Sequence, residues 1–212
     1  AAAPDLKRLT LELGGNDAAI VLDDVDVDAV AEKLFWGAFQ NCGQVCSAIK
    51  RVYVPEKLYS PLVDRLAALA KGVKVGDGFT EGVQMGPLNN KPQFERVSML
   101  VEDAKKGGAR IAAGGAPVGG KGYFYQPTIV ADVAEGVRLV DEEQFGPALP
   151  VLSYRNLDDA VERANRTSFG LSGSVWSQDP ERATAVASRL ECGTAWVNQH
   201  LAIVPFAPFG GA

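Results

Sequence analysis

The sequence predicts an α/β protein with a mostly parallel open sheet and helices on both of its faces. Apolar runs of strand length alternate with longer segments of helical period, and the chain's 23 glycines gather at the connections between them. Strands that alternate with helices usually pair in parallel, because each helix carries the chain back across the sheet. With 212 residues and a hydrophobic fraction of 47%, the chain is long enough to bury a sizeable core.

The first predicted strand is residues 9–13, Leu-Thr-Leu-Glu-Leu, which alternate apolar and polar side chains as a half-buried strand does. The leucines share one face, so Thr10 and Glu12 point to the other. Gly14-Gly15 end the strand. Open α/β sheets place their active sites at the carboxyl ends of their strands, which makes Glu12 a candidate functional carboxylate. The alternative interpretation of Glu12 is an exposed polar strand residue.

The later elements follow from the same two periodicities. Apolar runs predict strands over residues 18–22, 49–54, 110–113, 173–176 and 194–197, and extended segments over 123–133 and 148–154. Helical spacing predicts helices over residues 23–39, from 55 onward, over 91–107, 157–165 and 180–190. A glycine-rich turn spans residues 114–122, and the tail from residue 204 is irregular.

Composition excludes several classes of function. The net charge is -5 and no Lys/Arg cluster is long enough for a nucleic-acid surface, so the pairs Lys50-Arg51 and Lys105-Lys106 are interpreted as solvated. One histidine and no clustered ligands argue against a metal site. Three cysteines, an odd number, favour reduced thiols and a cytoplasmic location. No run of about 18 apolar residues predicts a membrane span.

Residues 41–47, Asn-Cys-Gly-Gln-Val-Cys-Ser, form a predicted loop or short helical turn before the strand at residue 49. Gly43 permits a sharp bend, so the thiol of Cys46 can face a cleft, and a nearby helix start or free backbone N–H groups would favour its thiolate. The commoner fate of a free cysteine is that of a small buried hydrophobe. A metal pair with Cys42 lacks further ligands.

A third candidate segment is residues 142–147, Glu-Glu-Gln-Phe-Gly-Pro, where two carboxylates and an aromatic ring precede a strand. One interpretation is a solvated turn. The functional one is a carboxylate that accepts hydrogen bonds from the hydroxyl groups of a ligand, with the ring beside it.

Together these segments resemble the aldehyde dehydrogenase superfamily. The resemblance rests on Leu-Glu-Leu-Gly-Gly at 11–15, Asn-x-Gly-Gln-x-Cys at 41–46 and Glu-Glu-x-Phe-Gly-Pro at 142–147, in that order. It extends to Gln93-Phe94, residues 165–173, Gly-Thr-x-Trp-Val-Asn at 193–198 and Pro-Phe-Gly-Gly at 208–211, and so covers essentially the whole chain. The position after Gly15, often lysine in relatives, is Asn16.

The resemblance implies oxidation of an aldehyde to a carboxylate with NAD or NADP. Cys46 would attack the aldehyde through a thiohemiacetal and a thioester, with its own N–H as part of the oxyanion hole, and Glu12 would activate the hydrolytic water. The residues implied to contact the dinucleotide are Glu143, Phe145, Leu13, Gly14 and Gln93. The residues implied to line the aldehyde tunnel are Trp36, Gln40, His200, Ile203 and Phe209. A structural role for His200 is the alternative.

The resemblance also implies that residues 1–212 are one catalytic domain, and that the cofactor-binding domain and the carboxyl-terminal oligomerisation segment of the family are largely absent. The partners expected for the parent enzyme are a small aldehyde, its own cofactor domain and sister subunits, with no nucleic acid and no membrane. The 212-residue chain alone is expected not to bind the dinucleotide usefully and to be inactive or weakly active.

Two alternative functions share this fold. An acylating relative would pass the acyl group to coenzyme A; such relatives commonly lack the deacylating glutamate, and Glu12 favours hydrolysis. A non-catalytic, crystallin-like protein is expected to lose the thiol or one of the carboxylates, whereas Cys46, Glu12 and Glu143 are all present.

Overall fold

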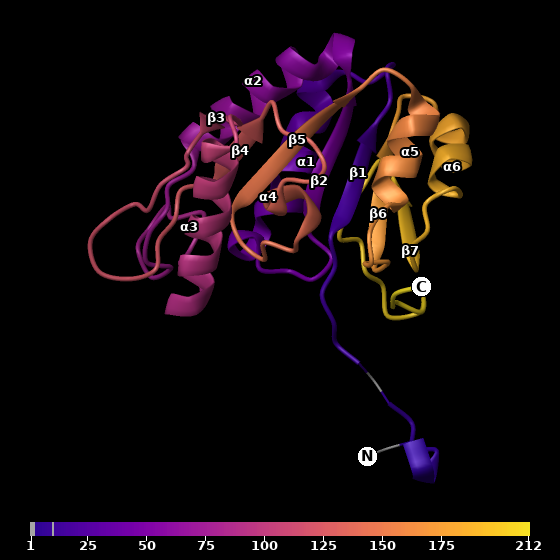
Figure 1. Ribbon diagram of the computed structural model, residues 1–212, viewed down its shortest axis with the longest axis horizontal. Coiled ribbons are helices and arrows are strands. Elements are labelled where there is room, and N and C mark those ends of the chain that lie inside the picture. Colours follow the sequence, from indigo (N-terminus) through magenta and orange to yellow (C-terminus); the bar gives the residue numbers. More distant parts are fainter. Residues whose placement is uncertain (1–2, 10) are drawn as a thin grey trace.

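The structure is a computed structural model that describes residues 3–9 and 11–212. Over this part of the chain, seven strands form one sheet in the order β3-β4-β5-β2-β1-β6-β7 (Figure 1). The pairs β4–β5, β5–β2, β2–β1, β1–β6 and β6–β7 are parallel, and only the edge pair β3–β4 is antiparallel. The predicted α/β class with a mostly parallel open sheet is therefore confirmed.

The sheet and its helices account for most of the described chain. The strands are β1 (Asp17–Val21), β2 (Ile49–Pro55), β3 (Arg110–Ala113), β4 (Thr128–Ala131), β5 (Ala148–Tyr154), β6 (Ser172–Trp176) and β7 (Thr194–Val197). The α-helices are α1 (Val27–Phe39), α2 (Glu56–Gly72), α3 (Lys91–Lys106), α4 (Arg138–Asp141), α5 (Leu157–Asn165) and α6 (Pro180–Ala187), and short 3-10 helices span η1 (Ala3–Asp5) and η2 (Gln40–Gly43).

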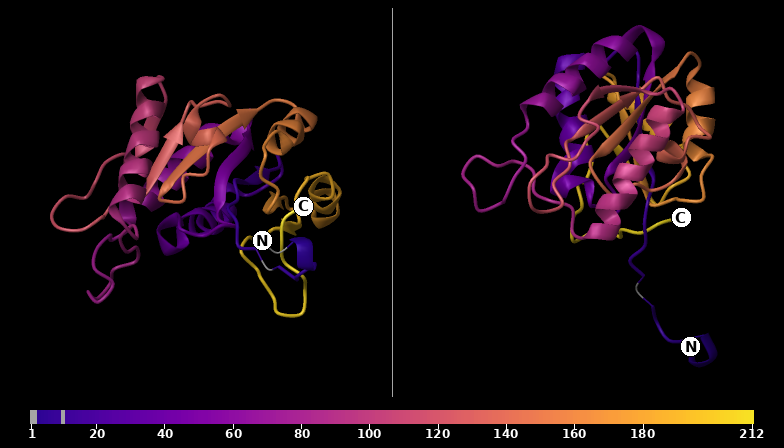
Figure 2. Two further views of the ribbon diagram at one scale, coloured as in Figure 1. Left: turned by 60° about the horizontal axis from the view of Figure 1, so that its bottom comes forward. Right: turned by 60° about the vertical axis from the view of Figure 1, so that its left-hand side comes forward.

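Two hydrophobic cores lie on opposite faces of the sheet. In β1, Ala19 and Val21 belong to one core and Ala18 and Ile20 to the other, as the alternation of a strand requires. Helices α1, α2 and α3 cover the first face, and α5 and α6 cover the second (Figures 1 and 2). Central strands covered on both faces have no solvated side, so every residue of β1 and β2 is buried.

The expected strand at residues 9–13 is wrong for the residues that the structure describes. Residues 7–9 and 11–16 have no regular secondary structure, and Thr10 lies outside the described residues. Leu9, Leu11 and Leu13 are 64%, 66% and 68% exposed. Alternating side chains form a strand only where a neighbouring strand pairs with them, and this segment extends away from the sheet (Figure 1). The first strand begins instead at Asp17.

This shift changes which edge of the sheet carries the candidate residues. Glu12 precedes β1, Cys46 precedes β2 and Glu143 precedes β5, so all three lie near the amino ends of parallel strands. The edge is the lower one in Figure 1. The expectation of a site at the carboxyl ends, drawn from other open α/β sheets, is wrong here. Helices that lead down from the opposite edge, such as α1, end beside this site.

The described residues contain neither a membrane-spanning helix nor a cluster of metal ligands. None of the helices in residues 3–9 and 11–212 combines the length and the apolar character needed to cross a membrane. Over the same ranges, no three or more His, Cys, Asp or Glu side chains gather in a way that would hold a metal ion.

Candidate active site

A cleft of about 350 Å³ opens at the amino ends of β1, β2 and β6. Its lining includes both Cys46, which is half-buried, and Glu12, which is exposed. The other lining residues are Leu11, Leu13, Gly14, Ser168, Phe169, Gly170, Leu171, Phe209, Gly210, Gly211 and Ala212. The structure thus brings to one cleft a thiol and a carboxylate that are far apart in the sequence.

The turn that presents Cys46 is left-handed over three consecutive residues. Asn41, Cys42 and Gly43 have φ values of 51°, 59° and 71° after the last turn of α1. A non-glycine residue in this region is strained, and such strain is typical of functional loops. Gly43 has a second constraint, since a Cβ there would lie 2.4 Å from the carbonyl oxygen of Gly146. The sharp bend expected at Gly43 is present and begins two residues earlier.

Two side chains of the motif brace this turn. Asn41 donates to the carbonyl of Gln44 at 3.0 Å, and Gln44 donates back to the carbonyl of Asn41 at 3.1 Å. The same Gln44 amide donates to Pro87 at 3.3 Å, and its oxygen accepts from the N–H of Asn89 at 2.8 Å. These bonds use backbone groups that a left-handed turn frees from helical pairing. The spacing Asn-x-Gly-Gln therefore has a structural cause that needs no ligand.

The three thiols have different surroundings. Burial raises the pKa of Cys42 to about 12 and, as the first of several causes, that of Cys192 to about 11. Both are therefore protonated at neutral pH and poor nucleophiles. Neither lines the cleft that Cys46 lines. Only Cys46 combines access to the cleft with a place on the braced turn.

A helix start near Cys46, which would favour its thiolate, is not what the structure shows. The turn follows the carboxyl end of α1, where Gln40 N–H donates to the carbonyl of Trp36. The partial charge at that end of a helix is negative and disfavours a nearby anion. The helix that precedes this turn therefore offers no favourable charge to an anion.

Lys50 is the group that sequence reasoning missed. It was expected on a solvated face with Arg51, yet the two residues are 1% and 3% exposed. The Lys50 ammonium donates to the carbonyls of Val45 at 2.9 Å and Cys46 at 3.0 Å, and lies 3.4 Å from Glu143 Oε1. The signal for its burial was its place in β2, a central strand with both faces covered.

The carboxylate of Glu143 packs against Gly14 and Gly15. Its Oε1 accepts from the N–H of Gly15 at 3.1 Å. A Cβ on Gly14 would lie 2.1 Å from Oε2, so only glycine permits this approach. The side chain of Glu143 is 18% exposed, and one of its oxygens is held by the protein. A carboxylate fixed in this way fits the hydroxyl pair of a ribose, which needs a preplaced acceptor.

Gln93 and Phe145 belong to the same neighbourhood, though not to the cleft of Cys46. Gln93 uses its amide donors on the carbonyls of Gln144 at 2.7 Å and Phe145 at 2.9 Å, which leaves its oxygen for a ribose. Phe145 is half-buried at a φ of 45° and lines an adjoining hollow of about 430 Å³ with Asn41 and others. The Lys50 ammonium lies 5.9 Å from the centroid of the Phe145 ring.

Of the predicted tunnel residues, Phe209 lines the cleft, whereas Trp36, Gln40, His200 and Ile203 do not. The ring of His200 is engaged on both sides. Nε2 lies 2.7 Å from the carbonyl of Ser47 and must donate to it, so Nδ1 accepts from Ser174 Oγ at 2.9 Å. Burial lowers the pKa of His200 to about 3, which keeps the ring neutral. These contacts favour the structural role of His200.

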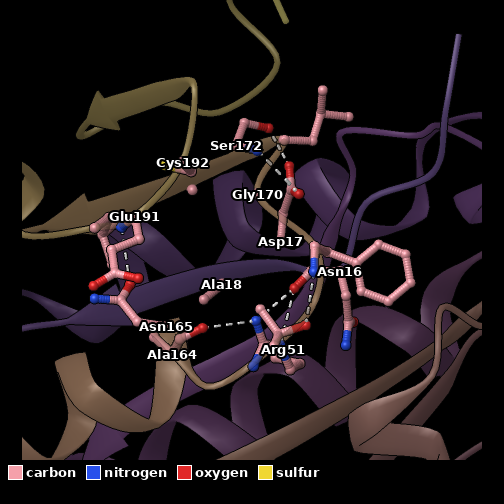
Figure 3. A pocket seen from close by; sticks show the side chains of 15 residues that line it. Asn16, Asp17, Ala18, Arg51, Ala164, Asn165, Gly170, Ser172, Glu191 and Cys192 are labelled. Atoms are coloured by element: carbon pink, nitrogen blue, oxygen red, sulfur yellow. Dashed lines mark hydrogen bonds between the residues drawn. The ribbon is translucent and has the colours of Figure 1, made fainter. Parts of the chain in front are cut away.

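A small polar cavity of about 20 Å³ lies beside the amino end of β1 (Figure 3). Arg51 donates to the carbonyls of Asn16 at 2.7 Å and Ala164 at 3.1 Å, and Asp17 accepts from Ser172. The cavity has room for about one water molecule. The buried side-chain oxygen of Asn16 has no hydrogen-bond partner there. The bonds of Arg51 and Asp17 tie β2 to α5 and β1 to β6, so we interpret the cavity as a support of the site.

Fold and site together define a class of proteins: α/β domains in which a cysteine and a carboxylate line one cleft at the edge of the sheet. The family model for the aldehyde dehydrogenase family matches residues 1–212, and the chain belongs to that family. The resemblance seen in the motifs is thereby confirmed.

Individual relatives of known sequence or structure are also aldehyde dehydrogenases. The chain is 42% identical over 207 residues to aldehyde dehydrogenase 1A1 of Bos taurus, a match over 98% of this chain and 41% of that protein. It is 41% identical over 211 residues to retinaldehyde dehydrogenase 3 of Rattus norvegicus, a match over 100% of this chain and 41% of that protein. An NAD+ complex of an aldehyde dehydrogenase from Bacillus cereus matches all of this chain and 43% of its own, at a TM-score of 0.95 and 42% identity. The chain thus spans less than half of the length of these relatives.

Proposed function

We propose that this chain is the thiol-bearing catalytic part of an enzyme that oxidises an aldehyde to a carboxylate with NAD+ or NADP+. The observation that carries the proposal is that Cys46 and Glu12 line the same cleft. Family membership supports the reaction class, and the Bacillus cereus relative is described as an NAD+ complex. A cytoplasmic location is proposed with it; a 42% identical relative from Macroscelides proboscideus is named as cytosolic.

The side chains divide the reaction into two halves. The Cys46 thiolate attacks the carbonyl carbon of the aldehyde, and the resulting oxyanion is stabilised by the Cys46 N–H. The bound dinucleotide would supply the hydride acceptor, which leaves the substrate as a thioester on Cys46. Glu12 then takes a proton from water, and the hydroxide attacks the thioester and releases the carboxylate and the thiol. Both halves need access to one cleft.

The residues of the cofactor segment fit a dinucleotide. Glu143 would hold the ribose hydroxyls with the oxygen that Gly15 and Lys50 leave available. Leu13 and Gly14 would contact the nicotinamide end from the wall of the cleft, with Phe145 beside it. Gln93 would offer its side-chain oxygen to the second ribose.

The test uses a chimera in which residues 1–212 replace the matching part of the Bacillus cereus aldehyde dehydrogenase. Aldehyde-dependent reduction of the dinucleotide is measured by absorbance. Changing Cys46→Ala should lower kcat/KM at least about a thousandfold, because the nucleophile is lost. The matched control is Cys192→Ser, a thiol outside the cleft, which should retain activity. Full activity of the Cys46→Ala chimera would refute the proposal.

The hydrolytic half is tested in the same chimera through Glu12→Gln. Hydrolysis should slow by about a hundredfold, and a thioester on Cys46 should accumulate and be detected by intact mass. Added coenzyme A distinguishes the acylating alternative: release of an acyl-coenzyme A instead of a carboxylate by the unaltered chimera would favour that reaction.

We also propose that the 212-residue chain by itself neither binds the dinucleotide usefully nor oxidises aldehyde at a normal rate. The groups that it offers to the cofactor are the Glu143 carboxylate and the walls of the cleft. Leu9, Leu11 and Leu13 are exposed, and apolar surface of this kind usually meets another domain or subunit. Calorimetric titration of the chain with NAD+ should show no binding in the micromolar range. A micromolar Kd would contradict this proposal and leave the reaction itself untouched.

A further inference from the structure

The buried ammonium of Lys50 has all of its partners around the active-site turn. It donates to two consecutive carbonyls, those of Val45 and Cys46, and its third direction faces Glu143. An ammonium has three N–H donors, so these three oxygens satisfy it. The long side chain of Lys50 starts in β2 and reaches under the turn, and 1% of it is exposed.

Placing a cation here is costly, and the structure shows what offsets the cost. Burial lowers the pKa of Lys50, while the nearby Asp17, Glu143 and Cys46 act in the opposite direction. The groups that face it come from four places: Asp17 on β1, Glu143 in the loop after α4, Cys46 in the turn, and His200 after β7. Burial also raises the pKa of Asp17 to about 7, against hydrogen bonding from Ser172 and the charge of Lys50.

The hydrogen bonds from Lys50 to the carbonyls of Val45 and Cys46 also fix the direction of the N–H groups in the same peptide units. In a trans peptide the N–H is antiparallel to the C=O of the same unit. Because Lys50 holds the Val45 carbonyl, the Cys46 N–H that shares its peptide unit points away from Lys50. The His200 ring donates to the carbonyl of Ser47, two residues after Val45, at 2.7 Å. The three consecutive carbonyls 45, 46 and 47 are therefore all held by side chains, those of the buried Lys50 and the half-buried His200.

The charge of Lys50 lies against the backbone of the residue that carries the sulfur. The turn follows the carboxyl end of α1, which disfavours an anion. Lys50 supplies a positive charge on the inner side of the same turn, bonded to the backbone of Cys46 itself. A cation near a thiol favours its ionised form.

We propose that Lys50 is a positioning residue for Cys46: its ammonium turns the Cys46 N–H toward the cleft and favours the thiolate that attacks the substrate. The inference rests on the proposed function only in the identity of Cys46 as the nucleophile. It assigns two effects to one side chain, and each has its own measurement on the 212-residue chain, with neither dinucleotide nor aldehyde present.

The charge effect is measured by alkylation of Cys46 with iodoacetamide across a range of pH, followed at the level of the Cys46 peptide by mass spectrometry. Lys50→Met should move the midpoint of the profile upward, because a neighbouring cation is lost. Glu143→Gln should move it downward, because Lys50 then loses a compensating anion. Lys50→Arg, which keeps the charge, should recover most of the shift. A merely structural Lys50 gives no such pair of opposite shifts.

The orientation effect is measured by comparing two reactions at a pH above the midpoint, where Cys46 is ionised. Acylation by p-nitrophenyl acetate forms a sulfur–carbon bond, passes through an oxyanion and expels p-nitrophenolate. Alkylation forms no oxyanion. Lys50→Met should therefore slow acylation at least about tenfold more than alkylation, since the oxyanion donor is no longer aimed.

The control is Lys57→Met, which removes a lysine with a side-chain exposure of 60% that pairs with Asp23. It should leave both reactions unchanged. Folding of each variant is checked by circular dichroism and a cooperative melt. If Lys50→Met does not fold, Glu143→Gln still decides the charge effect. An unmoved midpoint in Glu143→Gln, or shifts of the same sign in both variants, would overturn the proposal. Aldehyde oxidation by the Cys46→Ala chimera would instead refute the proposed function, and it would not change the alkylation and acylation rates that test Lys50.

Discussion

The segment that carries Glu12 and the turn that carries Cys46 meet at one cleft but are held in opposite ways. Around Cys46, the side chains of Asn41, Gln44, Lys50 and His200 bind the backbone of residues 41–47. The segment before β1 has no regular structure from residue 11 to 16, and its leucines are about two-thirds exposed. The chain therefore fixes the turn of Cys46 through its own contacts. It leaves the apolar face of the segment with Glu12 uncovered.

The most severe way to disturb the braced turn is Gly43→Val. The position has a φ of 71°, and a Cβ there would lie 2.4 Å from a backbone oxygen. A β-branched residue adds strain and a clash with atoms that cannot move aside, so unfolding in urea should show a loss of about 3 kcal/mol or more. Gly86→Ala is the control, because nothing lies within 4 Å of its Cβ position. It should change stability by less than about 0.5 kcal/mol. Equal losses would show that the turn is not constrained as described.

The second prediction compares the three thiols. At pH 8, an electrophile should label Cys46 at least about a hundredfold faster than Cys42 or Cys192, because burial raises the pKa of both to about 12 and about 11. The rates are read from the three cysteine peptides by mass spectrometry. Equal labelling, or none, would favour the non-catalytic, crystallin-like alternative. Cys46→Ser should remove the fast phase and nothing else.

The same contrast marks how far the sequence could predict this molecule. The order and the periods of the strands and helices gave the α/β class, because period two and period 3.6 are local properties of the chain. The three motifs pointed to the residues that gather at one edge of the sheet. The edge itself was predicted wrongly, because residues 9–13 have the alternation of a strand but no strand beside them. The alternation of apolar and polar residues shows that a segment could bury one face. Whether it forms a strand depends on a neighbouring strand that pairs with it.

The burial of Lys50 and the contacts of His200 could not be predicted from the sequence for a related reason. Whether a charged residue is buried depends on the layers that cover it, and the covering of β2 is a property of the whole sheet. The contacts of His200 with Ser47 and Ser174 join segments separated by 153 and 26 positions in the chain. No local pattern records such pairs.

The third prediction concerns the pH dependence of stability, where the expected change for each pH unit is smaller. The pKa of His200 is about 3 in the folded protein and lies near 6.5 when the ring is free. As pH falls below 6.5, His200 takes up a proton in the unfolded chain but stays neutral in the folded one. The unfolding free energy therefore falls by up to about 1.4 kcal/mol for each pH unit between 6.5 and 3. His200→Gln keeps a donor for Ser47 and cannot be protonated. Its unfolding free energy, subtracted from that of the unaltered protein at each pH, should isolate this slope, and a flat difference from pH 6.5 to 4.5 would contradict the burial of a neutral ring.

The smallest effect is expected in the segment of Glu12. The double change Leu9→Ser and Leu11→Ser replaces side chains that are 64% and 66% exposed, so it should alter unfolding free energy by less than about 0.5 kcal/mol for each. Leu66→Ala, at a buried position of α2, should lower the unfolding free energy by about 2–5 kcal/mol and serves as the comparison. The exposed leucines should still matter for association, because apolar surface left uncovered promotes contact between copies. Light scattering should show the unaltered chain larger than a monomer and the double variant closer to one. A clean monomer in both would mean that this face needs no cover.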